Sequence, residues 1–78
     1  MNNMEEKIIK LIAEVLQVPT GDVTTETEIG ELDEWDSLRN VTIIAELQKQ
    51  FNITITQDML MDLENVADII DLVEDLTK

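Results

Sequence analysis

The chain has 78 residues, no cysteine and no histidine, and a formal net charge of −13 from 18 acidic and 5 basic residues. Its length suits one small domain over residues 1–78, and the missing cysteines exclude disulfides and thiolate metal sites. The missing histidines disfavour a self-contained hydrolase or metalloenzyme, although two carboxylates alone could still do acid–base work, and we expect no enzyme, no catalytic residue and no metal site. The negative charge makes nucleic acid a poor partner.

The N-terminus has neither the basic start nor the apolar run of a signal peptide. No stretch of the chain approaches the length of a transmembrane helix. We therefore expect a cytoplasmic, monomeric protein with no membrane insertion.

The first predicted element is an amphipathic helix from about Met4 to Gln17, which Pro19 and Gly21 are expected to stop. From Val18 to Asp36 no period is sustained, which indicates a long ordered loop with room for a short turn of helix. Four apolar residues along this loop are expected to hold it to the core, the last of them half-buried: Val23, Ile29, Leu32 and Trp35.

A second helix is predicted from Ser37 to about Phe51, with Asp36 as its N-cap. Ile43 lies off the centre of its apolar stripe, and core packing is its favoured role. The stripe that we expect to be buried comprises Leu38, Val41, Ile44, Ala45, Leu47 and Phe51.

The remaining segment predicts an extended connector and two more helices. Thr56 is expected to cap a short helix ending near Met61, and Asn65 to cap a last helix ending near Leu76. Asp68 suggests reciprocal capping of that last helix. The fold class is therefore all-α: a small bundle of three main helices and one short helix, with the long loop between the first two.

Ser37 is the candidate functional residue, at the junction of the long loop and the second helix. A serine there is ordinarily a capping or first-turn residue. No histidine or cysteine can activate it, and no glycine-flanked elbow surrounds it, so a nucleophilic role is disfavoured. An exposed serine on a rigid junction suits a group installed by another enzyme, and the helix dipole favours an anionic one.

The motif Asp36-Ser37-Leu38 and the spacing after it resemble the acyl carrier protein family over nearly the whole chain. The resemblance implies an acyl-carrier-like bundle and a covalent 4′-phosphopantetheine arm on Ser37. It also implies that Asp36 contacts the phosphopantetheinyl transferase and that Leu38 contacts partner enzymes. Those partners would be an acyl- or aminoacyl-loading ligase or transferase and downstream acyl-processing enzymes. The downstream positions that carry the resemblance are Val41, Ile43, Ile44, Leu47 and Phe51.

Arg39 departs from the family pattern, because an acid usually follows Asp-Ser-Leu in carriers of fatty-acid synthesis. Only Glu46 is acidic in the interior of the second helix, so basic docking patches would lose attraction there and Arg39 would repel them. We therefore expect a discrete carrier of a specialised pathway. An aminoacyl or peptidyl carrier and an unmodified acidic helical adaptor remain alternatives, whereas a calcium protein is disfavoured because the EF-hand pattern is missing.

Overall fold

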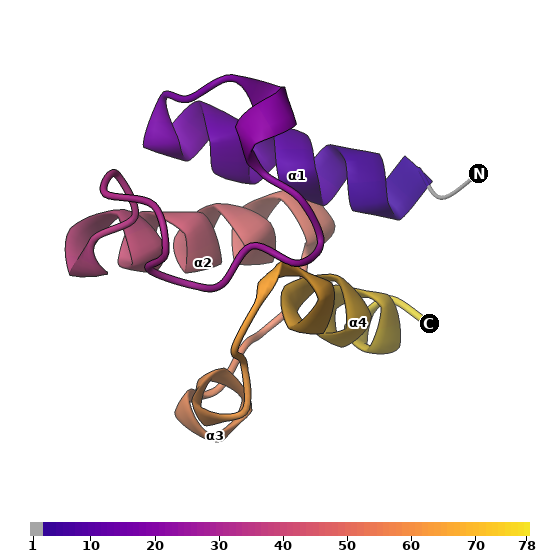
Figure 1. Ribbon diagram of the computed structural model, residues 1–78. Coiled ribbons are helices and arrows are strands. Elements are labelled where there is room, and N and C mark those ends of the chain that lie inside the picture. Colours follow the sequence, from indigo (N-terminus) through magenta and orange to yellow (C-terminus); the bar gives the residue numbers. More distant parts are fainter. Residues whose placement is uncertain (1–2) are drawn as a thin grey trace.

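The computed structural model describes residues 3–78, and within them it shows four α-helices and one short 3₁₀ helix (Figure 1). Helices α1 (Asn3–Leu16) and α2 (Ser37–Phe51) run antiparallel, side by side, and α4 (Val66–Leu76) also packs against α1 (Figure 1). Within residues 3–78 no strand forms, and the only β pairing is an isolated bridge, so the predicted all-α class is confirmed. The elements are α1 (Asn3–Leu16), η1 (Thr20–Asp22), α2 (Ser37–Phe51), α3 (Gln57–Met61) and α4 (Val66–Leu76).

Helices α1 and α2 end at residues with left-handed backbone, Gln17 with φ 60° and Asn52 with φ 55°. At the end of α1 the Val18 N–H donates to the Ala13 carbonyl at 3.1 Å. This is the long closing bond of a Schellman motif, which satisfies a carbonyl that the helix end leaves open. The helix therefore ends at its own left-handed cap, two residues before Pro19.

The core is aliphatic apart from one indole ring. Ile43 and Leu47 direct α2 into it and have no exposed surface, so core packing of Ile43 is confirmed. Burying one such side chain contributes about 1.5–3 kcal/mol. The buried apolar residues are Ile8, Leu11, Ile12, Ala13, Leu16, Val23, Trp35, Ile43, Ile44, Leu47, Ile55, Val66, Ile69, Ile70 and Val73.

The predicted stripe of α2 was wrong at Leu38, Val41 and Ala45, which are all exposed. The apolar residues of α2 occupy two faces of the helix. Leu38, Val41 and Ala45 follow an i, i+3, i+7 spacing and share one face, whereas Ile43 and Leu47 share another. The core covers the face with Ile43 and Leu47 and leaves the other to solvent.

The long loop is fastened to the start of α4. The Val66 N–H donates to the Thr27 carbonyl and the Ala67 N–H donates to the Thr25 carbonyl, each at 2.9 Å. A helix leaves its first N–H groups without internal partners, so the loop supplies acceptors that α4 lacks. The expected anchoring by apolar residues is confirmed, and Trp35 is only 3% exposed, more deeply buried than predicted.

The predicted caps of α3 and α4 are confirmed. Thr56 accepts the Met59 N–H, and the Asn65 Oδ1 accepts the Asp68 N–H at 2.9 Å. The Asp68 Oδ2 accepts the Glu64 N–H at 2.9 Å, so its return bond reaches one residue beyond the cap. Within residues 3–78, no helix combines the length and the apolarity needed to cross a bilayer.

Candidate functional site

Ser37 is the first residue of α2 and is exposed, as the sequence predicts. Within residues 3–78 its hydroxyl takes part in no hydrogen bond. The long loop leads directly into the start of α2, the positive end of the helix dipole (Figure 1). A free hydroxyl at a helix start can accept a transferred anionic group without breaking any contact of the fold.

Asp36 caps α2 from the residue before Ser37. Its backbone is extended, and its Oδ1 accepts the Arg39 N–H at 2.8 Å. Its carbonyl accepts the Asn40 N–H at 2.9 Å, the first i to i+4 bond of the helix. The cap therefore fixes the backbone on both sides of Ser37.

Replacing Asp36 with alanine should lower the free energy of unfolding by about 0.5–2 kcal/mol, the usual cost of an N-cap. The change removes the acceptor for a first-turn N–H and leaves the core untouched. Urea denaturation followed by circular dichroism measures it. Asp36→Asn keeps the acceptor and should recover most of the loss, and an equal loss in both variants would count against a capping role.

Arg39 ties the end of the loop to the first turn of α2. Its Nη1 donates to the Glu34 carbonyl at 3.2 Å and lies 3.7 Å from the Asp36 Oδ2. Both partners precede Ser37 in the chain, so the guanidinium links the first turn of α2 to the end of the loop. Because the ion pair is largely exposed, it contributes little stability, and its main effect is to offset negative charge beside Ser37.

Trp35 and Asn40 close the turn from inside. The Trp35 Nε1 donates to the Asn40 Oδ1 at 3.0 Å, which joins the residue two before Ser37 to the residue three after it. Gly30, with φ 88°, folds the loop back toward Trp35. The sequence analysis missed this hydrogen bond, because a spacing of five residues across a loop–helix junction has no sequence signature.

A hollow of about 240 Å³ lies directly beside Ser37, between the loop and α2. It gives a group on the Ser37 hydroxyl space on the loop side of the helix. Its lining residues are Ile29, Gly30, Trp35, Asp36, Ser37 and Asn40.

A second hollow of about 250 Å³ separates α2 from the α3 segment and is mostly apolar. It begins at Asn40, one helical turn after Ser37. Val41 lines it, and Leu38 and Met61 belong to the two helices that border it; these are the exposed large apolar residues of the described chain, with 65%, 75% and 74% of their surface exposed. The hollow is lined by Asn40, Val41, Ile44, Ala45, Gln48, Ile55 and Leu60.

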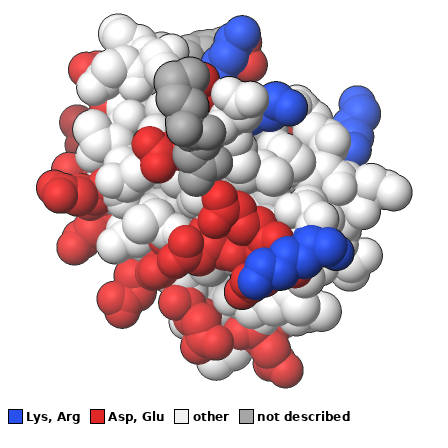
Figure 2. Space-filling model, turned by 90° about the vertical axis from the view of Figure 1, so that its right-hand side faces the viewer, with Lys and Arg blue, Asp and Glu red and all other residues white. Residues whose placement is uncertain are grey.

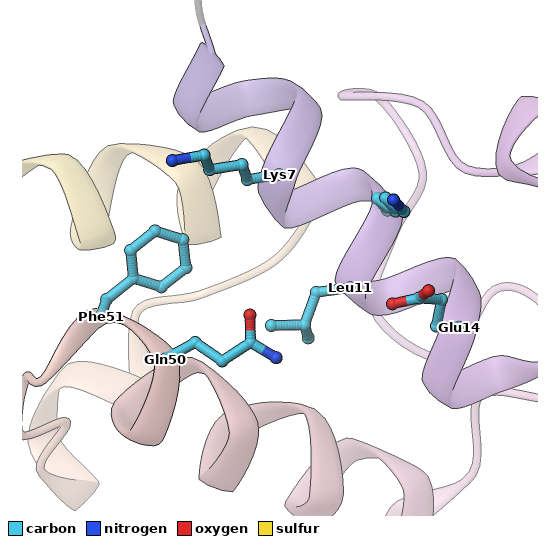
Figure 3. Close-up of a pocket in the computed structure, with 6 residues that line it drawn as sticks. Lys7, Leu11, Glu14, Gln50 and Phe51 are labelled. Atoms are coloured by element: carbon cyan, nitrogen blue, oxygen red, sulfur yellow. The ribbon is translucent and has the colours of Figure 1, made fainter.

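A third hollow, of about 420 Å³, lies at the other end of α2 (Figure 3). Lys7, Leu11 and Glu14 face it from α1, and Gln50 and Phe51 face it from α2 (Figure 3). With a rise of 1.5 Å per residue, its α2 side is about 20 Å along the helix axis from Ser37. It is therefore separate from the site around the serine.

Acidic side chains dominate the lower part of the face shown in Figure 2, and basic ones lie mainly at its upper right. In α4 the acids are Asp68, Asp71, Glu74 and Asp75, whereas α2 holds only Glu46. In the part of the chain that the structure describes, no group of three acidic residues could hold a metal ion. The acidic residues therefore act together as a general negative field. Among the long helices, α2 is the least acidic.

Comparison with known proteins shows which family has this helical architecture. The family model described as the phosphopantetheine attachment site matches residues 6–73. The acyl carrier protein of Porphyromonas gingivalis is 32% identical over 74 residues, 95% of each chain, and that of Buchnera aphidicola is 35% identical over the same shares. The solution structure of a holo acyl carrier protein from Geobacter metallireducens superposes with a TM-score of 0.85, at 27% identity, over 96% of this chain and 86% of that one.

The chain belongs to the acyl carrier protein family. The cofactor of this family is a covalently attached 4′-phosphopantetheine. Members of the family are carriers rather than catalysts, and they interact with phosphopantetheinyl transferases and acyl-processing enzymes. The arm supplies the thiol that this chain, without cysteine, does not have.

Proposed function

We propose that Ser37 is the attachment residue and that this protein presents an acyl thioester to the enzymes of a specialised pathway in the cytoplasm. The observation that carries the proposal is the exposed Ser37 hydroxyl, free of hydrogen bonds in the described chain, at the first position of α2. Among residues 3–78, no other residue combines a hydroxyl that can accept a transferred group, a capped helix start and an adjoining hollow.

The surroundings of Ser37 fit a phosphodiester. The start of α2 favours an anion, and the Arg39 guanidinium offsets the negative charge of Asp36. The hollow beside Trp35 and Gly30 leaves room for the first atoms of the arm. The residues that would hold it are therefore Ser37 by the covalent bond and Arg39 by charge.

The direct test is modification in vitro. The purified protein is incubated with coenzyme A, Mg²⁺ and a phosphopantetheinyl transferase of broad specificity, and its intact mass is measured. We expect the mass of one phosphopantetheine to be added. An unchanged mass, with a transferase that modifies another carrier in the same tube, would favour the unmodified adaptor.

The apolar surface around Leu38, Val41 and Met61 is the proposed docking surface for partner enzymes. Leu38 follows Ser37 directly in the chain, Val41 lines the second hollow, and Met61 follows Leu60, which lines it from α3, so a partner that approaches the cargo would meet these exposed side chains. Asp36 and Arg39 border this surface and supply its charge. A partner with an apolar patch fits it better than one with a basic patch.

Arg39 is proposed to keep this protein from serving as the carrier of general fatty-acid synthesis. In a strain whose own carrier is depleted, we expect this protein to fail to restore growth. Arg39→Glu should restore it in part, because an acid replaces the repelling cation where basic partners dock. Lys49→Glu makes the same change of charge elsewhere on α2 and is the control for Arg39→Glu. Full rescue of growth by the unchanged protein would contradict the specialised role.

A further inference from the structure

Two carboxamides border the otherwise apolar hollow between α2 and α3. Asn40 and Gln48 lie on the same helix, about 12 Å apart along its axis at 1.5 Å per residue. Both side chains are half-buried. The pair is not explained by attachment at Ser37, because an apolar lining would serve a plain hydrocarbon chain better.

Each of the two side-chain amides is oriented by a neighbouring N–H group, which can donate a hydrogen bond but cannot accept one. The Trp35 Nε1–H donates to the Asn40 Oδ1 at 3.0 Å, and the Ile55 backbone N–H donates to the Gln48 Oε1 at 2.9 Å. An indole N–H and a backbone N–H require an oxygen opposite them, so the NH₂ of each amide is the end left over. Within residues 3–78 neither NH₂ group donates a hydrogen bond.

These unused donors set a preference among cargoes. A saturated chain that fills the hollow would remove water from the NH₂ groups and return no hydrogen bond, which is unfavourable. A chain that carries carbonyl or hydroxyl oxygens would replace the lost water contacts. A cavity of about 150 Å³ holds a benzene ring, so 250 Å³ has room for roughly eight to ten carbon atoms.

We propose that the cargo is a medium-length acyl group bearing carbonyl or hydroxyl oxygens along its chain, recognised by the NH₂ groups of Asn40 and Gln48. This inference rests on the proposed attachment of the arm at Ser37. The two amides are specificity-determining residues, and the apolar residues between them accommodate the intervening carbons.

The test compares two cargoes of equal length, octanoyl and 3-oxooctanoyl, loaded from their coenzyme A thioesters and verified by intact mass. We expect the 3-oxo form to melt about 4–8 °C higher, the shift that one ordinary hydrogen bond gives in a domain of this size. In ¹⁵N-labelled protein, the side-chain NH₂ resonances of Asn40 or Gln48 should move with the 3-oxo cargo and stay in place with octanoyl.

The variants Asn40→Asp and Gln48→Glu keep the acceptor oxygens for Trp35 and Ile55, remove the NH₂ donors and add one negative charge each. At least one should abolish the difference between the two cargoes. Gln57→Glu adds the same charge at an exposed position outside the hollow and should preserve it.

Equal melting temperatures for the two cargoes, with unmoved amide resonances, would overturn the proposed cargo preference. The proposed carrier function would still stand, because the loading had been verified by intact mass. A failure to load in every variant and in the unchanged protein would overturn both.

Discussion

Replacement of Ser37 by alanine is expected to abolish phosphopantetheine attachment and to leave the fold intact. The hydroxyl is the oxygen that must join the phosphate, and alanine offers none. The side chain is exposed and makes no hydrogen bond within residues 3–78, so its loss should change the free energy of unfolding by less than about 0.5 kcal/mol. Intact mass after transferase treatment gives the first result, and thermal denaturation gives the second.

Thr42 provides the matched control on the same helix. Its hydroxyl is also exposed, but it donates to the Leu38 carbonyl within the helix and does not lie at a helix start. Thr42→Ala should therefore be modified as fully as the unchanged protein. A mass gain in the Ser37→Ala variant, or its loss in Thr42→Ala, would place the attachment elsewhere.

Replacement of Trp35 by alanine is expected to have the largest effect on stability, a loss of about 3–5 kcal/mol. The ring is 3% exposed, belongs to the buried core and joins the long loop to Asn40 of α2. A domain of this size is stabilised by only about 4–12 kcal/mol in total, so the variant should be partly unfolded near physiological temperature. Urea denaturation followed by circular dichroism measures the change, since the variant has lost its only fluorescent indole.

Trp35→Phe separates ring packing from the hydrogen bond. Phenylalanine keeps most of the buried apolar surface but leaves the half-buried Asn40 oxygen without its donor. We expect a smaller loss, of about 1–3 kcal/mol, together with slower modification at Ser37 because the turn is no longer closed from inside. Equal losses in the alanine and phenylalanine variants would show that packing of the ring contributes little.

The helices and their caps were predictable because their signals are local. Asp36, Thr56 and Asn65 precede apolar spacing of helical period, and each caps the helix expected of it. The end of α1 was not predictable in the same way. Gln17 adopts a left-handed backbone that glutamine rarely takes, and Val18 completes the closing bond, so the stop signals expected at Pro19 and Gly21 came after the helix had ended.

Burial on α2 was harder to predict because the helix has two apolar faces. Periodicity alone cannot tell which face the rest of the chain will cover. The side with Ile43 and Leu47 packs into the core, while Leu38 and Val41 stay in solvent. Apolar residues that the core does not cover are the part of the surface available to partners, so this error in the prediction locates the proposed docking surface.

The candidate serine itself was predictable from its place between a loop and a helix, but its surroundings were not. The Trp35–Asn40 bond and the orientation of the Gln48 amide join residues five and seven positions apart through loop geometry. No local pattern specifies such bonds. They depend on how the loop returns to α2, which is a property of the whole fold.

The central claim is that one serine carries the arm, and fragmentation of the intact modified protein in a mass spectrometer tests it most directly. After treatment with coenzyme A, Mg²⁺ and an active transferase, we predict one added phosphopantetheine, with fragments on either side of Ser37 placing the added mass on that residue alone. An unmodified protein, or an added mass on any other residue, would contradict the account.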